Sequence, residues 1–427
     1  MKYKTVQDTI HGSIRFYGPF LELLETPEVQ RLSGISQLGL TSLVFPGANH
    51  TRLEHSMGAY RVAERMAGAL GLPEEEKHTV MAAALLHDIG HAPFSHTLES
   101  ILAHESGKDH MDITKELITG EVFTENRDSP TIPEILESGD LVPSNIAELI
   151  KGEERPLPLD NINVHKGQAY FGGEQYLYHM VHGPMDVDQI DYLLRDSHYT
   201  GAAHGIIDLE RLLQTVEIHN GDLVISKGGV SAVEGMLVAR GLMFSSVYLH
   251  KTARIAELML TKGVTPLKEQ FQEIYRMVDW ELFGMLKSKG GFQWEMVERL
   301  KQRRLYKKCF TLTTDMLEDT DIFHDPDFGT IDFIRALERN IASRKHISPN
   351  NVIVDIPDKE LKLSEPRLEK TNIKVLDDGR LDDMYKYSPL CRALQKRPSI
   401  SWVLMVSCPR ELRDTVEEAA RKEIIRR

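Results

Sequence analysis

The most reactive side chains of the sequence form a set of imidazoles and carboxylates. His87 and Asp88 are adjacent, His55 precedes them, and Asp188 follows much later in the chain. Such ligands suit Mn, Fe, Ni or Zn and, with more water, Mg. A divalent ion held by them lowers the pKa of bound water and polarises a phosphoryl oxygen. The residue types therefore predict a metal site suited to phosphate hydrolysis.

Three separate segments with helical periodicity carry these residues. Apolar residues recur at helical spacing after Arg52, an apolar run over 79–86 leads into His87, and the periodicity returns over 185–196. Facing helices are the usual source of ligands for a metal inside a helical bundle. A lone histidine or a lone His-Asp pair is more often an ordinary surface or core feature, so the argument needs the flanking residues as well.

Composition bounds the class of protein. The chain has 427 residues, a hydrophobic fraction of 41%, a net charge of −13 and three cysteines. The hydrophobic fraction excludes wholesale disorder, and the sparse cysteines favour a reducing compartment, so we expect a cytoplasmic protein. The negative net charge argues against sequence-independent nucleic-acid binding. We find no stretch of about 18 apolar residues that would span a membrane and no secretory leader.

The organisation changes along the chain. Residues 120–175 are rich in proline and acidic residues, which predicts short helices and loops that could cover a cleft. Strand-like runs at 351–356, 372–376 and 401–406 precede a charged helix from 409 onward. We therefore expect a helical unit over 1–310 and a small α+β appendage over 311–427.

The residues around the His-Asp pair are similar to those of the HD-domain deoxynucleoside triphosphate triphosphohydrolases, in the branch that includes the animal SAM- and HD-domain protein. The matching motifs lie between residues 4 and 310, at 8–12, 26–32, 35–39, 44–58, 85–96 and 186–196. The resemblance implies a mainly α fold, with an HD-domain helical bundle, a short N-terminal β-hairpin and the C-terminal appendage. It also implies cleavage of deoxynucleoside triphosphates into deoxynucleoside and inorganic triphosphate.

The same resemblance assigns roles to residues. The metal ligands would be His55, His87, Asp88 and Asp188. His91 would contact the reacting phosphate and His96 would protonate the leaving group, with support from His110 and Glu99. Glu99 stands where the family commonly has Asp, and Met111-Asp112 follows His110 where the family often has Glu, so the sequence departs from the family pattern at both supporting positions. On the last ligand helix, Asp186 is expected at the helix start and Asp191 as a solvated or bracing charge.

Substrate contacts follow from further matching positions. The resemblance implies that these residues bind substrate: Arg52, Gln37, Leu38, Gln189, Tyr192, Asp196, Arg240 and Tyr248. Arg52 and Arg240 would grip phosphates, since arginine is suited to bidentate phosphate contacts. Gln189 stands where the family has a lysine, which removes one cation from the phosphate site. For Leu38 and Tyr248, simple core packing is an equal alternative.

Regulation and assembly are also implied by the resemblance. Lys4, Glu25 and Gln30 are similar to parts of a nucleotide effector site between subunits, whereas Ser33 replaces an arginine. We therefore expect a homo-oligomer, dimer or tetramer, whose nucleotide effector or effector affinity differs from the family's. Two alternatives to triphosphate release stay open: another nucleotide phosphohydrolase, such as a nucleotidase or phosphodiesterase, and a nucleotide-sensing scaffold with a structural metal.

Overall fold

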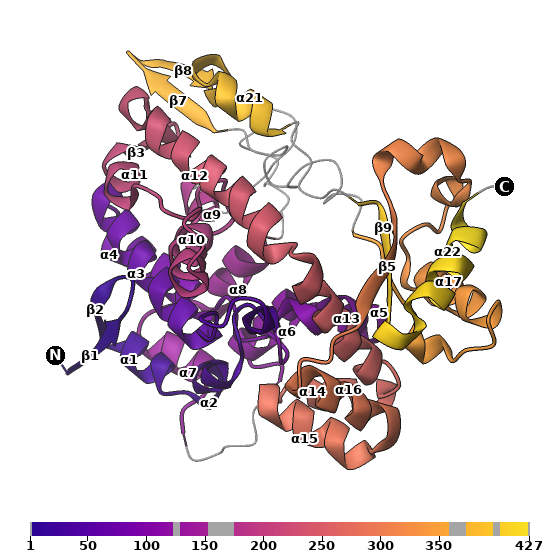
Figure 1. The fold of residues 1–427 in the computed structure, drawn as a ribbon. Coiled ribbons are helices and arrows are strands. Elements are labelled where there is room, and N and C mark those ends of the chain that lie inside the picture. The colour runs from indigo at the N-terminus through magenta and orange to yellow at the C-terminus, as the bar shows by residue number, and fades with distance from the viewer. Residues whose placement is uncertain (1, 123–128, 153–174, 358–372, 396–401, 426–427) are drawn as a thin grey trace.

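The computed structural model describes residues 2–122, 129–152, 175–357, 373–395 and 402–425. A large helical body fills one side of the molecule, and a smaller α/β lobe formed by the end of the chain fills the other (Figure 1). This architecture confirms the expected mainly α fold with small β elements. Much of the acidic segment at 120–175 lies outside the described residues, so its predicted position over a cleft stays a prediction.

The body begins with an antiparallel hairpin, β1 (Tyr3–Asp8) and β2 (Gly12–Tyr17), as expected. Phe16 of β2 stacks on Tyr60 at a centroid distance of 4.7 Å. The helices of the body that follow are α1 (Pro19–Leu24), α2 (Pro27–Arg31), α3 (Arg52–Leu70), α4 (Glu74–Leu86), α5 (His96–Ser106), α6 (His110–Thr119), α7 (Ile132–Ser138), α8 (Pro143–Lys151), α9 (Gln175–His182), α10 (Val187–Thr200), α11 (Leu209–Thr215), α12 (Val230–Met243), α13 (Lys251–Val264), α14 (Phe271–Ile274), α15 (Asp279–Lys289) and α16 (Gly291–Lys301).

Local sequence explains the ends of the helix that carries His55. A capping box links Thr51 and Glu54 at the start of α3, where each side chain bonds the backbone of the other residue. Gly71 ends the helix in the left-handed conformation, with φ 65°. Helix α4 then packs antiparallel to α3 after a short turn, so His55 and the end of α4 come together.

Apolar residues recur at helical spacing after Pro27, at Val29, Leu32, Ile35 and Leu38, but the helix at this point is short. It ends at Arg31, and a 3₁₀ turn covers Leu32–Gly34. A Cβ at Gly34 would lie 2.6 Å from the Trp280 ring, so the chain approaches α15 closely at this point. The next residues are extended and bond the segment before α3, with Arg52 N–H donating to the Ile35 carbonyl at 2.9 Å. Because these residues pair with the segment before α3, the helix does not continue beyond this point.

The C-terminal strands belong to two sheets. One sheet has the order β5 (Lys307–Leu312), β9 (Leu404–Cys408), β6 (Ile353–Asp355), and α17 (Ile331–Ser343) and α22 (Arg413–Ile424) pack beside it. The other sheet has the order β3 (Val216–His219), β4 (Asp222–Ser226), β7 (Lys374–Asp377), β8 (Arg380–Asp383). The strands predicted at 351–356, 372–376 and 401–406 thus exist in shortened or shifted form, and residues 372 and 401 lie outside the described residues.

The second sheet spans the expected boundary at residue 310. Strand β7 pairs in parallel with β4 of the helical body, and α20 (Met384–Tyr387) and α21 (Pro389–Gln395) follow it. Val375 and Met384 are buried in the core of that body. Figure 1 shows β7, β8 and α21 beside α12, away from the lobe that contains β9. Residues 374–395 therefore return to the first part of the chain, because their apolar faces complete its core.

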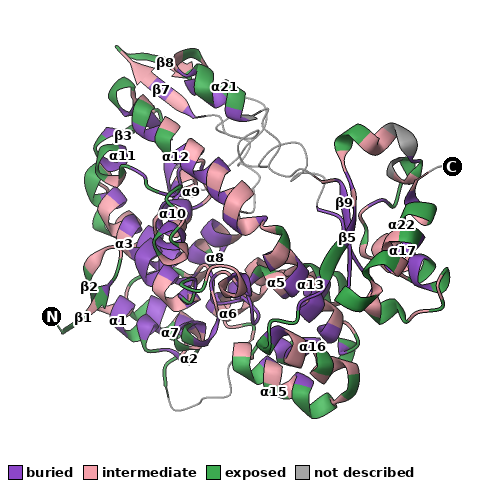
Figure 2. Cartoon of the chain, in the orientation of Figure 1, coloured by how far each residue is buried: buried purple, intermediate pink, exposed green. Residues whose placement is uncertain are grey.

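Buried residues concentrate along the inner faces of α3, α4, α10 and α12 (Figure 2). The helical run Lys227–Tyr248, which includes α12, is long and apolar enough to pass a membrane-span test, with a mean hydropathy of 1.3. This finding differs from the expectation that no such stretch exists. Half of this apolar segment is buried inside the protein, and the segment contains Arg240. Both features are equally consistent with the core helix of a folded protein.

Candidate active site

His55, His87 and Asp188 converge from α3, the end of α4 and α10. Their ligand-type atoms all lie within 4.8 Å of one another. His55 Nε2 is 3.3 Å from His87 Nε2 and 3.0 Å from Asp188 Oδ1. Asp88 adds an oxygen 3.3 Å from His87 Nε2. The structure therefore brings together the whole predicted ligand set, in a donor combination that fits a divalent transition-metal ion.

The orientation of both imidazoles also fits a metal. His55 Nδ1–H donates to Asp191 Oδ2 at 2.8 Å, and His87 Nδ1–H donates to the Ala84 carbonyl at 2.8 Å. Each Nε2 consequently faces the cluster, which is the tautomer that metal binding needs. Burial alone would lower the pKa of His55, but hydrogen bonds to Asp188 and Asp191 raise that pKa to about 10. Such surroundings favour positive charge at this point.

Asp191 is the buried centre of a polar network behind His55. Besides His55 it accepts hydrogen bonds from His11 Nε2 at 2.7 Å and from both Nε and Nη2 of Arg195 at 2.9 Å. Arg195 Nη1 also reaches Asp8 at 2.8 Å. A Cβ at Gly58 would lie 1.9 Å from Asp191 Oδ1, so only glycine lets α3 approach this closely. Asp191 was expected to be either a solvated charge or a bracing charge, and its geometry fits the bracing role.

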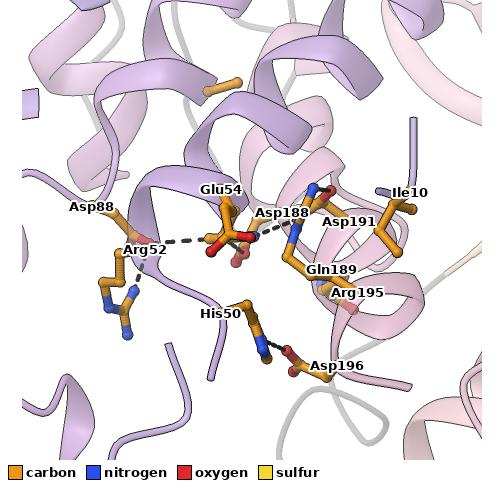
Figure 3. Close-up of polar contacts among 12 residues, drawn as sticks. Ile10, His50, Arg52, Glu54, Asp88, Asp188, Gln189, Asp191, Arg195 and Asp196 are labelled. Atoms are coloured by element: carbon orange, nitrogen blue, oxygen red, sulfur yellow. Dashed lines mark hydrogen bonds and ion pairs between the residues drawn. The ribbon is translucent and has the colours of Figure 1, made fainter. Parts of the chain in front are cut away.

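Arg52 links the metal cluster to the following loop. Its Nη1 donates to Asp88 Oδ2 at 2.5 Å (Figure 3). Its Nε donates to Ser95 Oγ at 2.7 Å, while its Nη2 has no partner in the described structure. Burial would raise the pKa of Asp88, but Arg52, His87 and His91 hold it well below its usual range. The unpaired Nη2 of a buried guanidinium is suited to a phosphate oxygen.

The loop between α4 and α5 holds the candidate catalytic histidines. Phe94 and Ser95 adopt positive φ values of 58° and 55°, a strained conformation fixed by hydrogen bonds from Phe94 N–H to Asp279 and from Ser95 Oγ to the Ser36 carbonyl. The chain thus turns back sharply after His91. The His91 and His96 rings lie 4.9 Å apart.

Glu99 joins the histidines of this loop to α6. It accepts from His96 Nδ1 at 2.6 Å and from His110 Nδ1, and the His110 ring stacks on His91 at 4.0 Å. Burial would raise the pKa of Glu99, but the two histidine hydrogen bonds lower it well below its ordinary value. Burial and the neighbouring Arg52 and His110 lower the pKa of His91, which keeps that ring neutral.

One cavity of about 520 Å³, a size typical of small-molecule sites, is lined by His87, Asp88, Asp188, His91, His96 and His110, whereas His55 and Glu99 are not among its lining residues. Of the predicted substrate contacts, those that line it are Gln37, Leu38, Arg52, Tyr192, Asp196, Arg240 and Tyr248. Asp196 accepts from the Tyr248 hydroxyl at 2.7 Å and from His50 Nε2 at 2.8 Å, and the latter bond is drawn in Figure 3. The Gln37 Oε1 is buried without a partner. These atoms supply hydrogen-bonding groups for a sugar.

Gln189 is the predicted substrate contact that the cavity does not include. It is fully buried, its Nε2 donates to Asp186 Oδ2 at 2.6 Å and to the Gly183 carbonyl at 2.9 Å, and its Oε1 accepts from Arg240 Nη1. Its amide therefore positions Arg240 and does not face the cavity. The predicted helix-start role of Asp186 is confirmed, because its side chain caps α10.

Several residues of the site were not anticipated from the sequence. Arg31 is one of them: its guanidinium donates to the backbone carbonyls of Ile89 and His91, at 2.7 and 2.8 Å, and so fixes the catalytic loop. His11 is another, and it lies 180 positions from its partner Asp191. Arg254 and Glu257 of α13 also line the cavity. No local spacing links any of these residues to the His-Asp pair, so only the fold reveals them.

Comparisons with known proteins agree with this geometry. The chain is 30% identical over 422 residues to an uncharacterized protein of Methanocaldococcus jannaschii, covering 96% of this chain and 80% of that one. It is 30% identical over 276 residues to the deoxynucleoside triphosphate triphosphohydrolase SAMHD1 of Homo sapiens, covering 60% of this chain and 44% of the human one. A hypothetical protein from Aquifex aeolicus has a similar structure, with a TM-score of 0.74, 27% identity, and coverage of 98% of this chain and 100% of that one.

Two family models account for most of the described residues. The HD domain model matches residues 52–196, a range that contains the complete His-Asp cluster. The HD associated region matches residues 207–425, which include both the sheet of β7 and β8 and the C-terminal lobe. The first range provides the metal-type ligands, and the second provides the wall formed by α12 and α13. The chain therefore belongs to the HD-domain phosphohydrolase family.

Proposed function

We propose that the protein hydrolyses deoxynucleoside triphosphates to a deoxynucleoside and inorganic triphosphate, with a divalent ion as cofactor. The observation that carries this proposal is a His-His-Asp cluster whose His87 and Asp188 line one cavity together with two buried arginines and a polar sugar end. The similarity to triphosphohydrolases named for deoxynucleotide substrates supports the same reaction. Mn, Fe, Mg, Ni and Zn are all candidate ions.

His55, His87 and Asp188 would hold the ion, with Asp88 as a fourth ligand. When bound, it would act as a Lewis acid on the α-phosphate and lower the pKa of water. Arg52 and Arg240 would bind the phosphates, because their buried guanidinium groups provide fixed positive charge with little reorganisation. This arrangement would orient the bond between the α-phosphorus and O5′.

The loop histidines would complete the reaction. His96 directs Nδ1 to Glu99, which leaves Nε2 as the atom that can transfer a proton to O5′ while the P–O5′ bond breaks. His91 would contact the reacting phosphate, and His110 with Glu99 would position the acid. Such a proton is needed because a sugar alkoxide is a poor leaving group.

The sugar end would select the deoxyribose. Tyr248 is bonded to Asp196, and its ring lies 6.0 Å from that of Tyr192. An aromatic ring fixed at this place would crowd a 2′-hydroxyl, and such a hydroxyl would find no compensating hydrogen bond. Gln37 and Asp196 would bind the remaining 3′-hydroxyl. We further propose a cytoplasmic homo-oligomer, either a dimer or a tetramer.

One observation favours a second candidate, a nucleotidase or a phosphodiesterase. The amide of Gln189 is engaged with Arg240, at a position where a lysine would add a cation for distal phosphates. With less positive charge, the preference for a triphosphate over a shorter phosphate chain would weaken. A scaffold without turnover is disfavoured, because a scaffold would not need the acid group formed by His96 and Glu99.

Product analysis tests the proposal. The purified chain is incubated with each of the four deoxynucleoside triphosphates and Mn²⁺ or Mg²⁺, and the products are resolved by chromatography. We expect deoxynucleoside and triphosphate in equal amounts, and loss of turnover in Asp188→Ala. Release of monophosphate or diphosphate instead would favour the second candidate. Unchanged turnover in Asp188→Ala would exclude the metal cluster as the active site.

A further inference from the structure

The wall of the cavity on α13 carries two charged residues that the proposed reaction does not use. Arg254 and Glu257 are three residues apart, so they lie on one face of the helix. Arg254 Nε and Nη2 donate to Asp355 of β6 at 2.9 and 2.6 Å. No hydrogen bond or ion pair to the Glu257 carboxylate is found within the described structure. A half-buried acid without a partner thus faces the cavity.

Glu257 is next to the sugar contacts. A Cβ built on Gly39, which directly follows Leu38, would lie 3.8 Å from Glu257 Oε1 and 2.7 Å from Thr97 Oγ1. The wall beyond Leu38 therefore consists of Gly39, Thr97 and Glu257. Helix α13 is attached here, because Thr261 Oγ1 donates to the Thr97 carbonyl at 2.9 Å. A nucleoside whose sugar lies against Leu38 would place its base along this wall.

The charges of the cavity orient such a nucleotide. Arg52 and Arg240 attract the phosphates, whereas a carboxyl group repels them and accepts hydrogen bonds from neutral donors. Burial raises the pKa of Glu257 to about 7, with Arg254 opposing this shift and Asp355 adding to it. Because Asp355 engages Arg254, that guanidinium does not pair with Glu257. The carboxyl group of Glu257 is therefore available to bind a ligand.

We propose that Glu257 accepts hydrogen bonds from the Watson–Crick edge of the bound base and so favours guanine over thymine. Guanine presents two adjacent donors, N1–H and the N2 amino group, which match the two oxygens of a carboxylate. Thymine presents one N–H between two carbonyl oxygens, which would face the carboxylate unfavourably. The inference rests on the proposed function, because it needs a nucleotide in this cavity.

A competition assay tests the inference. Equal concentrations of dGTP and dTTP are mixed with the protein and Mn²⁺ at pH 8, where Glu257 is mostly ionised, and the ratio of the two deoxynucleosides released gives the ratio of kcat/KM. We expect the wild type to favour dGTP and Glu257→Gln to lower this ratio about tenfold, because a hydrogen bond to a charged acceptor is lost. Glu269→Gln, at an exposed position shortly after α13, is the matched control and should keep the wild-type ratio.

A second variant distinguishes a change in base preference from an effect of misfolding. Glu257→Asp keeps the charge but withdraws it by one methylene, so a partial fall of the ratio is expected; circular dichroism checks that each variant is folded. A wild type without preference for dGTP, or an unchanged ratio in both variants, would overturn the role of Glu257 while turnover itself still supports the proposed function. Absence of turnover with every deoxynucleotide would instead overturn the proposed function, and this inference with it.

Discussion

The two ends of the candidate active-site cavity, which we call the metal end and the acid end after the roles proposed for them, are built in different ways. At the metal end, His55 is 1% exposed and is held by Asp191 of α10, which is itself bonded to Arg195 one turn further along that helix and to His11 from the N-terminal hairpin. At the acid end, the His96 side chain is 69% exposed and is held by Glu99, three residues away. One end is a closed, buried network, and the other is a local cluster at the surface.

The difference in burial between the two ends indicates which functions depend on a rigid fold. A metal site needs ligand atoms fixed to within a fraction of an ångström, and buried hydrogen-bonded carboxylates supply that precision. A general acid must instead exchange protons with solvent after each turnover, which an exposed histidine does readily. We therefore expect substitutions at the metal end to change folding and metal affinity together, and substitutions at the acid end to change turnover alone.

The largest effect is expected from Asp191→Asn, which breaks the buried network. The amide leaves Arg195 without its full counter-charge, and loss of such a buried pair costs about 3 kcal/mol of unfolding free energy. Metal affinity should fall about 10- to 100-fold, because His55 loses the acceptor that fixes its ring. Urea unfolding in EDTA and calorimetric titration with Mn²⁺ measure the two effects separately.

The matched control for Asp191 is Asp332→Asn. The Asp332 side chain is 83% exposed, so its loss should change the unfolding free energy by less than about 0.5 kcal/mol. An Asp191→Asn protein with unaltered Mn²⁺ affinity would contradict the idea that the buried network holds the metal end.

The next effect is expected from Glu99→Gln at the acid end. Turnover should fall about 100-fold, which is typical for loss of general-acid function. Burial lowers the pKa of His110, but the Glu99 carboxylate more than compensates, so the optimum should move to lower pH in the variant. The pH dependence of kcat, measured beside urea unfolding and Mn²⁺ titration, reports this shift. Lost stability or lost metal affinity would show that the two ends are not independent.

The smallest effect concerns the pH dependence of stability at the α13 wall. Burial raises the pKa of Glu257 from its ordinary 4.5 to about 7, so the folded protein binds a proton that the unfolded chain releases between these values. Stability is therefore lost as pH rises from 4.5 through 7, and a shift of this size for one acid amounts to about 2.5 kcal/mol between pH 5 and pH 8. Urea unfolding at pH 5 and pH 8 should show this loss in the wild type and a smaller one in Glu257→Gln. An equal loss in both proteins would contradict the buried acid.

The sequence predicted best where the signals are local. Thr51 and Glu54 form a capping box within one turn, and the apolar run before His87 forms one helix, so α3 and α4 begin and end close to where expected. The N-terminal hairpin is likewise decided by adjacent residues. Local hydrogen bonds and helical periodicity are both encoded in neighbouring residues, which is why a sequence reveals them.

Prediction failed where distant segments compete with local preference. The helix after Pro27 is interrupted because residues 35–37 pair with the segment before α3. Gln189 is turned away from the cavity because Asp186, Gly183 and Arg240 satisfy its amide. The strands at 374–383 join β3 and β4 of the helical body because their apolar side chains complete its core.

By itself, the sequence determined the ligand types, their helical placement and the turn that presents the histidines, because spacing of a few residues fixes all three. The tertiary structure alone decided that Asp191 and His11 would stand behind His55, that Gln189 would support Arg240, and that Glu257 would face the cavity. These relations depend on how helices pack, and helix packing places in contact residues that no sequence spacing connects.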